Sequence, residues 1–180
     1  GDTYCELSAM PEAKRVLEDG LKLARATHPG DHTQTAEILN ALATVYQDLG
    51  DFEGAATLLR ESLDMLRRLH PGDHLSVSVG LNDFASALSS GDKHDEADAL
   101  FRESLAMARR LFPSDHPDLA TNLSNFGAAL FVRGDYDQAE PVLAEALAIN
   151  RRLHPGDHPN TASTLADLGV LRSRRGDITG

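Results

Sequence analysis

The segment His28-Pro-Gly-Asp-His32 decides the fold, because it returns three times at a fixed spacing. It reappears as His70-Pro-Gly-Asp-His74, as Phe112-Pro-Ser-Asp-His116 and as His154-Pro-Gly-Asp-His158. Each return begins 42 residues after the one before, with no insertion or deletion. Self-similarity with a period of about 20–50 residues is typical of repeat proteins, in which each unit packs only on its neighbours.

Apolar residues keep the same register and recur three or four residues apart. The clearest columns are Leu39, Leu81, Leu123 and Leu165, then Leu42, Phe84, Phe126 and Leu168, then Leu17, Leu59, Phe101 and Leu143. Small residues fill two further columns, at Ala43, Ala85, Gly127 and Gly169 and at Ala13, Ala55, Ala97 and Ala139. Spacings of three and four mark one face of a helix, so each unit predicts a first and a second helix. Helices are expected near residues 11–26, 32–49, 52–69, 75–90, 94–111, 117–133, 136–153 and 159–175.

The connections carry helix-ending and helix-starting residues. Gly50-Asp51 and Gly134-Asp135 predict turns in which glycine closes the first helix in the left-handed conformation. The Asp of each Pro-Gly-Asp string is expected to cap the next helix. The stretch from Leu75 to Val79 alternates like a strand, but the repeat register places it on a helix. The same unit has His94 in place of an aromatic residue and a glycine displaced to Gly91, so we expect its joint to be the softest.

Composition excludes several classes of function. The formal net charge of −11 argues against binding to nucleic acid, which requires clustered Lys and Arg, and against a polybasic membrane surface. No apolar run approaches the roughly 20 residues that span a bilayer. The single cysteine, Cys5, allows no internal disulfide and predicts a reducing, cytoplasmic location.

One unit reads Leu39-x-x-Leu42-Ala43-x-x-Tyr46, followed by Ala55-x-x-x-Leu59. This pattern resembles the tetratricopeptide repeat family. The 42-residue length, together with the Asp-His-Pro, Leu-Asn and Arg-Arg-Leu-His-Pro-Gly strings, is similar to the repeats of kinesin light chain and its bacterial relatives. The resemblance implies an all-α fold, a right-handed α-solenoid of antiparallel helix pairs, and a role in protein binding.

A single repeat array is expected over residues 1–180. It divides into a partial repeat at 1–30, full repeats at 31–72, 73–114 and 115–156, and a partial repeat at 157–180. Tyr4 and Leu7 align with Tyr46 and Leu49, which predicts that the chain starts inside a first helix. We interpret the chain as a fragment of a longer array.

The sequence contains no strong signal for a metal site or for catalysis. The His-x-x-x-His spacing, as in His28 and His32, is one that metal sites can use. However, the strings lie in loops and Phe112 replaces one of the histidines, so no metal or other cofactor is expected. No nucleophile, phosphate-binding or metalloprotease motif is present, so no catalytic residues and no enzymatic activity are expected. Arginine pairs such as Arg67-Arg68 are expected to offset the negative charge of the helix C-terminus and to form ion pairs with nearby acidic side chains. The alternative is that the recurring arginines form a row that binds an acidic partner or phosphate.

In such arrays the first helices line the concave surface. The face opposite the core columns then gives the candidate peptide-binding residues Glu37, Asn40, Thr44, Gln47, Val79, Asn82, Asp83, Ser86, Thr121, Asn125, Ala128, Phe131, Val132 and Asp167. Asparagine both donates to and accepts from a peptide backbone, whatever the side chains of that peptide. The leading hypothesis is therefore a scaffold that binds an extended partner segment in the groove. The alternative is a structural, self-associating or sensor arm of a larger protein such as a kinase or NTPase.

The charge of this face sets an expected partner chemistry. Glu37, Asp83 and Asp167 favour neutral or basic segments and would repel an acidic tail. An apolar partner side chain is expected near Phe131 and Val132, because buried aromatic contacts tend to dominate binding energy. End-to-end self-association is expected as well, through Leu165, Leu168 and Leu171 on a last helix that no second helix covers.

Overall fold

The computed structural model describes residues 2–156 and 158–176, with side chains from Met10 onward. The described residues form helices and connecting turns, with no strand. The helices are α1 (Asp2–Thr27), α2 (Thr33–Asp48), α3 (Phe52–Leu69), α4 (Leu75–Ser90), α5 (His94–Leu111), α6 (Pro117–Arg133), α7 (Tyr136–Leu153) and α8 (Pro159–Arg175). From α2 onward these bounds agree with the expected ones to within a residue, and Leu75 begins a helix rather than a strand. The all-α solenoid is confirmed.

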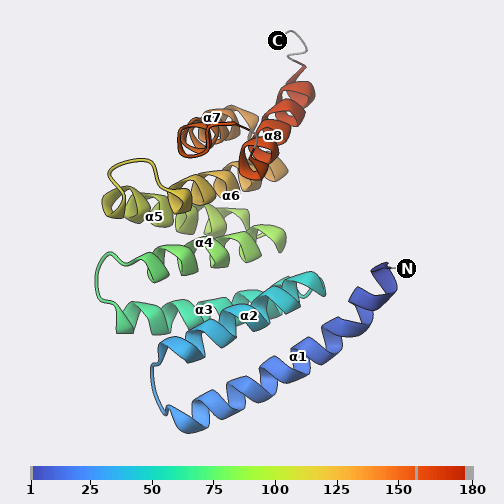
Figure 1. Ribbon diagram of the computed structural model, residues 1–180, viewed down its shortest axis with the longest axis vertical. Coiled ribbons are helices and arrows are strands. Elements are labelled where there is room, and N and C mark those ends of the chain that lie inside the picture. The colour runs from blue at the N-terminus through green and yellow to red at the C-terminus, as the bar shows by residue number, and fades with distance from the viewer. Residues whose placement is uncertain (1, 157, 177–180) are drawn as a thin grey trace.

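The helices stack in chain order into a curved array (Figure 1). Its core is built from the repeated columns, with Leu39, Leu81 and Leu123 fully buried. The small columns lie where two backbones approach. Ala55 and Ala97 are buried there, between the paired helices. Consecutive helices pack on one another along the whole array, so each unit completes the core of its neighbour.

The N-terminal helix departs from the expected boundaries. A first helix was expected to end before a second one began near residue 11, but α1 runs without interruption from Asp2 to Thr27. In the register of the repeat, Ser8-Ala9 stands where later units have Gly50-Asp51. Without a glycine to adopt the left-handed conformation, the chain continues as one helix. The expected alignment of the Tyr4 and Leu7 side chains lies outside the described side chains.

The turns between the two helices of a unit differ in one place. Gly50 and Gly134 adopt positive φ angles of 77° and 86°, as the sequence predicts. Between α4 and α5 the displaced Gly91 has φ −93°, and the non-glycine residue Asp92 takes φ 60° instead. Lys93 is the N-cap residue of α5 and makes no side-chain capping hydrogen bond. In contrast, Asp51 caps α3 by accepting from the Gly54 N–H at 2.8 Å. This joint therefore lacks two devices that stabilise the α2–α3 joint.

Replacing Asp92 with glycine is expected to stabilise the protein by about 1 kcal/mol, because glycine adopts the left-handed conformation without the steric cost of a Cβ. Urea unfolding followed by circular dichroism measures the change. Asp92→Asn is the matched control, since asparagine tolerates this conformation as aspartate does and removes only the charge. A glycine variant no more stable than the asparagine variant would show that the joint is not strained.

The helix caps correct one expectation. Each first helix is capped by the histidine that ends the repeated string, and not by the preceding aspartate. The Nδ1 atoms of His32, His74, His116 and His158 accept from the backbone N–H two residues on, each at 3.2 Å. The same ring stacks on the aromatic residue four positions earlier, so that His70 and His74 lie 3.7 Å apart and Phe112 and His116 lie 3.5 Å apart, centre to centre.

The displaced aspartates bind arginine instead. Arg68 donates from Nε and Nη2 to the two carboxylate oxygens of Asp31 at 2.6 and 2.8 Å, and Arg110 does the same to Asp73. The hydrogen bond from Arg68 holds the pKa of Asp31 below its ordinary value. In two of the pairs the other arginine reaches the next second helix, as Arg67 does to Glu103 at 2.7 Å and Arg109 to Glu145 at 2.8 Å. The expectation that these arginines pair with acids is confirmed.

The last helix corrects the expected pattern of exposure. Leu168 and Leu171 are buried, with exposed fractions of 5% and 0%, because they face α7. Only Leu165 of the three leucines is exposed. A charge at Leu168 would therefore disrupt the core, and the apolar end face is smaller than the sequence predicts.

Candidate functional site: the concave groove

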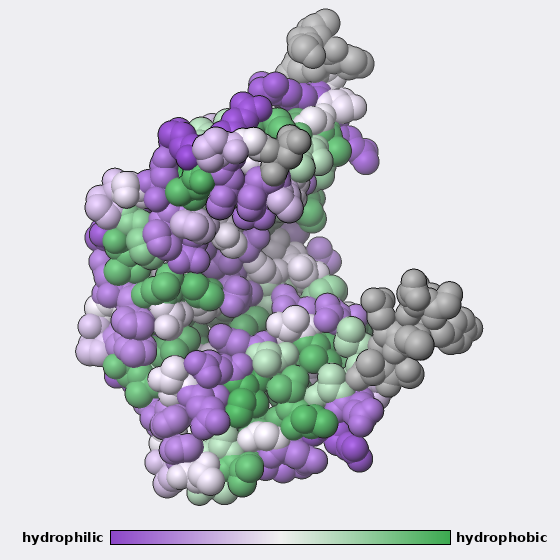
Figure 2. All heavy atoms as spheres, in the orientation of Figure 1, coloured by the Kyte–Doolittle hydropathy of each residue, from purple (hydrophilic) through white to green (hydrophobic). Residues whose placement is uncertain are grey.

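The candidate site lies on one face of the first helices α2, α4, α6 and α8. The molecule is hollowed on this side, and Figure 2 shows the hollow in profile. Exposed or partly exposed positions are Glu37, Asn40, Thr44, Gln47, Val79, Asp83, Ser86, Thr121, Asn125, Ala128, Phe131, Val132 and Asp167. Asn82 differs, because it is only 3% exposed. The structure thus leaves all but one of the predicted side chains accessible.

A pocket of about 210 Å³ opens between α4 and α6. Four predicted residues line it together: Ser86, Asn125, Ala128 and Val132. Ser89, Ser90, Ala129 and Phe101 also line the pocket, although they are not among the predicted residues. Phe101 stands in a core column, so its periodicity gave no sign of a second role.

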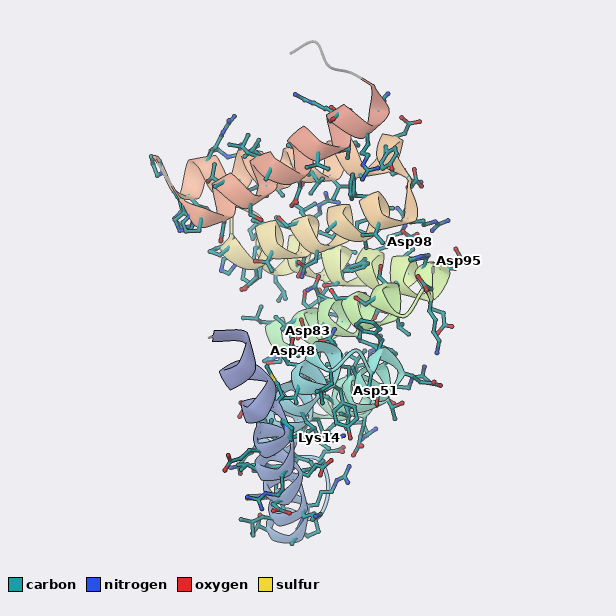
Figure 3. All side chains as sticks on the ribbon, turned by 90° about the vertical axis from the view of Figure 1, so that its right-hand side faces the viewer. Lys14, Asp48, Asp51, Asp83, Asp95 and Asp98 are labelled. Atoms are coloured by element: carbon teal, nitrogen blue, oxygen red, sulfur yellow. The ribbon has the colours of Figure 1, made fainter. Side chains whose placement is uncertain are left out.

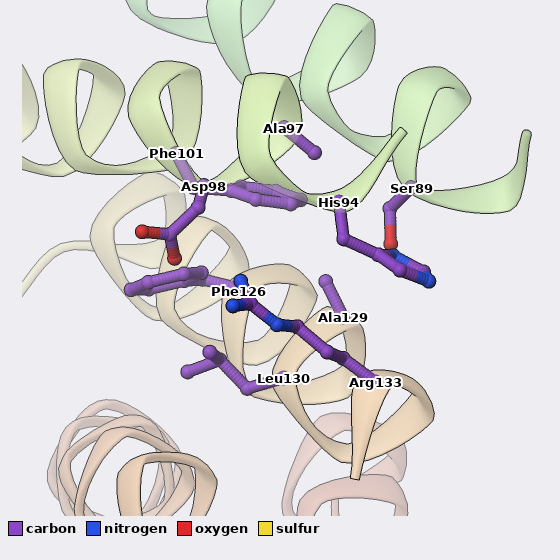
Figure 4. A pocket seen from close by; sticks show the side chains of 9 residues that line it. All are labelled: Ser89, His94, Ala97, Asp98, Phe101, Phe126, Ala129, Leu130 and Arg133. Atoms are coloured by element: carbon purple, nitrogen blue, oxygen red, sulfur yellow. The ribbon is translucent and has the colours of Figure 1, made fainter. Parts of the chain in front are cut away.

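The pocket exists because small residues replace larger ones in this unit. Ser86, Ser89 and Ser90 on α4 stand where α2 carries Thr44, Gln47 and Asp48. His94 stands where neighbouring units have Phe52 and Tyr136, and a narrow cavity of about 10 Å³ reaches it beneath the helix turns (Figure 4). The lost side-chain volume is not refilled by the backbone, so the space remains open.

Aromatic rings form the floor of this region (Figure 4). The Phe101 ring packs on Phe126 with 5.3 Å between centroids and 28° between planes. The Arg102 guanidinium carbon lies 5.3 Å from the centroid of the Phe126 ring. An apolar side chain entering the pocket would meet carbon on the floor and hydroxyl and amide groups at the rim, which is the usual composition of a ligand pocket.

Of the two residues predicted to form an apolar anchor, only Val132 lines the pocket. It is 70% exposed. Phe131 points elsewhere, and its ring packs at 5.5 Å on Tyr136 across the α6–α7 turn. Phe101 therefore supplies the aromatic ring that Phe131 was predicted to supply.

The groove continues toward α8. A depression of about 160 Å³ is lined by Thr121, Ser124, Asn150, Asn160, Ser163 and Thr164. Its walls are hydroxyl and amide groups, so it offers both donors and acceptors to a peptide backbone. Asp167 lies further along the same helix face, and burial raises the pKa of its carboxyl.

The groove becomes more acidic toward α2. Burial raises the pKa of Asp83, and a hydrogen bond from Asn82 opposes the rise only in part. Among the described residues, no Lys, Arg or His nitrogen lies within 4.0 Å of the carboxylate of Asp83 or of Asp48. Figure 3 labels both side chains, Asp48 on α2 and Asp83 on α4. This part of the groove is acidic and unpaired.

The residues suspected of metal chemistry have assigned structural roles. In each string where it occurs, the His-x-x-x-His pair is a stacked pair of rings that caps a helix. Groups of three or more potential metal-ligating side chains are not found in the part of the chain that the structure describes.

Comparison with known proteins decides the family. The family model for the tetratricopeptide repeat matches residues 1–68, 34–110 and 118–179, which together cover most of the sequence. The chain belongs to the tetratricopeptide repeat family. Its helix pairs are tetratricopeptide repeats of 42 residues, longer than the usual unit of about 34. No curated protein matches this tetratricopeptide repeat chain.

Solved structures of tetratricopeptide repeat proteins share the fold. A kinesin light chain protein of Podosopora anserina with nearly identical TPR-like repeats superposes with a TM-score of 0.79 at 20% identity, covering 98% of this chain and 84% of that one. BtubC (BKLC) of P. vanneervenii gives 0.81 at 22% identity, over 98% and 70%. A Rap protein complexed with competence and sporulation factor gives 0.73 at 19%, over 94% and 46%. The kinesin-light-chain-like repeat is confirmed at the level of the fold.

None of the described helices combines the length and the apolar character that a membrane-spanning helix needs.

Proposed function

We propose that this chain is a non-catalytic protein-interaction scaffold that binds an extended segment of a partner protein along the concave groove. The pocket between α4 and α6 carries the proposal, because it is open, has an aromatic floor and gathers four of the predicted residues at one place. The tetratricopeptide repeat fold supports it, since stacked helix pairs present extended concave binding surfaces. The Rap structure, which holds a competence and sporulation factor, provides a precedent in the same fold.

The recognition divides into two parts. Asn125 at the rim holds a backbone amide of the partner by donating to its carbonyl and accepting from its N–H. An apolar side chain of the partner enters between Ala128, Val132 and the Phe101 ring, where it leaves water. Ordering a flexible segment offsets much of this gain, so the affinity is about micromolar.

A blocked pocket tests the proposal. Ala128→Arg places a long side chain in the opening, and we expect it to lower peptide binding by at least about tenfold, since that corresponds to only about 1.4 kcal/mol. The probe is a phage-displayed library of random linear peptides selected on immobilised protein, followed by titration of the peptides that the wild type enriches. Ala106→Arg, at an exposed position on α5, is the matched control and should bind as the wild type does.

The variants that the sequence alone would favour are poor tests. Asn82 is buried and Phe131 packs on Tyr136, so alanine at either position would change folding as well as binding. Asn125→Ala remains informative, because Asn125 lies at the pocket rim. If neither Ala128→Arg nor Asn125→Ala weakens the selected peptides, binding in this groove is refuted.

A second candidate is self-association, which the ends of the array favour. Leu165 on α8 is 43% exposed, whereas its counterparts in the three preceding units are fully buried. On α1, Val16 and Leu23 are 59% and 66% exposed, whereas the residue equivalent to Leu23 in α3, Met65, is buried. In this reading the chain is a structural arm, and a second copy covers these faces.

Light scattering over a range of protein concentrations tests self-association. Leu165→Glu is expected to remove any rise of the average mass with concentration, because a charge on that face opposes apolar contact. Val170→Glu is the matched control, since Val170 is 50% exposed on a different face of the same helix. A mass that never rises, or that rises equally in both variants, would argue against this role.

A further inference from the structure

The groove between α2 and α4 is the repeat equivalent of the pocket between α4 and α6. Shifting the lining of that pocket back by one unit replaces Ser90 with Asp48 and Asn125 with Asp83. Because Ser90 and Asn125 line one opening, the repeat places Asp48 and Asp83 on the two walls of the preceding one. Two neighbouring positions of the groove therefore differ in chemistry, one apolar and one acidic.

Hydrogen-bond acceptors outnumber donors at the acidic position. The Oδ1 atoms of Asn40 and Asn82 are buried and accept no hydrogen bond. Asn82 is only 3% exposed, and its hydrogen bonding to the neighbouring Asp83 lowers the pKa of that carboxyl only in part. Buried acceptors without donors are rare in folded proteins and call for an explanation. This side of α2 and α4 is therefore short of hydrogen-bond donors.

We propose that the groove between α2 and α4 is a cationic subsite, in which Asp48 and Asp83 receive a lysine ammonium or arginine guanidinium group of the partner segment. This inference rests on the proposed function, because it names the chemistry of the same bound segment. Ammonium and guanidinium groups fit, since they carry three and five N–H donors, accept none, and form charge-assisted bonds with carboxylates.

The geometry also fixes the spacing of the recognised residues. The acidic groove between α2 and α4 and the pocket between α4 and α6 open on the two sides of α4, so they lie about one helix spacing apart, which is about 8–10 Å. An extended peptide advances about 3.3 Å per residue and alternates its side chains between two faces. The basic residue of the partner therefore lies two or three positions from the apolar residue that enters the pocket.

The ionisation of Asp83 agrees with a role in binding a cation. Burial raises the pKa of its carboxyl, so the folded protein holds the proton more readily than the unfolded chain does. Ionised Asp83 therefore opposes folding as the pH rises above the ordinary value for aspartate. Asp83→Asn is expected to raise the melting temperature of the free protein at neutral pH, and the difference should shrink as the pH falls toward that value. A bound cation would remove the same strain.

Peptide selection on three proteins tests the subsite. The proteins are the wild type, Asp83→Asn, and Asp64→Asn as a control at an exposed acidic position on α3. The probe is the same phage-displayed library of random linear peptides. The wild type and Asp64→Asn are expected to enrich Lys or Arg two or three positions from an apolar residue, while Asp83→Asn should keep the apolar preference and lose the basic one.

The outcomes separate the subsite from the groove. If the wild type enriches no peptide, the proposed function fails and the subsite fails with it. If the wild type enriches apolar peptides that Ala128→Arg rejects, but without a basic residue, only the subsite fails. Identical basic preferences in the wild type and Asp83→Asn would also overturn it, as would an Asp83→Asn protein that melts below the wild type at neutral pH.

A titration of one selected peptide gives the charge component directly. Asp83→Asn is expected to weaken binding about fivefold to tenfold at an ionic strength of about 0.1 M, where the screening length is about 10 Å. At about 1 M the screening length falls to about 3 Å, and the two proteins should then bind almost alike. A salt-independent difference between them would contradict an ionic contact at Asp83.

Discussion

Phe101→Ala is expected to destabilise the protein by about 3–5 kcal/mol, the range typical of truncating a buried phenylalanine. Phe101 is only 1% exposed, and its ring stacks on Phe126. Its removal would deepen the pocket between α4 and α6 from below, so the loss combines reduced burial with an unfilled cavity. Urea unfolding of the purified variant gives the free energy of unfolding.

Phe101→Leu separates the two contributions, because leucine restores most of the buried volume but not the aromatic stacking. It should cost clearly less than Phe101→Ala, since leucine stands at the same column in α3 and α7. If alanine and leucine were equally destabilising, stacking on Phe126 rather than packing would dominate. If Phe101→Ala lowered the free energy of unfolding by less than about 1 kcal/mol, the Phe101 ring would not be a well-packed floor of the pocket.

Gly127→Ala is expected to cost about 1–3 kcal/mol, although alanine is normally the better helix former. A Cβ at this position would lie 2.6 Å from both Cγ and Cδ2 of Leu143. Leu143 is fully buried on α7, so it has little room to move. The close approach of α6 and α7 therefore depends on the absence of a side chain at residue 127.

The matched control has the opposite expected sign. Gly169 occupies the same column on α8, but a Cβ there would meet no atom within 4 Å. Gly169→Ala should stabilise the protein by about 0.5–1 kcal/mol through helix propensity alone. Thermal unfolding of both variants would show the contrast, and two changes of the same sign would refute the packing argument.

The sequence predicted the helices and the buried columns because a fixed 42-residue register averages over local ambiguity. Leu75 to Val79 alternates like a strand, yet its equivalents in the other units identify it as helical. Four of the pocket residues could be predicted for the same reason, since the face opposite a buried column follows from the helical period.

The remaining features depend on atoms that periodicity does not describe. Asn82 shares its column with the partly exposed Asn40, but close packing of its neighbours buries it. The choice of histidine over aspartate as the helix cap depends on competition, because Arg68 takes the Asp31 carboxylate in the folded unit. The role of Phe101 beneath the pocket arises from small residues on two other helices.

The stacked rings of the connecting loops make one side chain at each connection responsible for two contacts. His74 accepts from the Ser76 N–H at the start of α4, and its ring stacks on His70. In the loop before α6, His116 stacks on Phe112 in the same way. The orientation of successive units therefore depends on one ring per loop, and a substitution of that ring would alter the curvature of the superhelix.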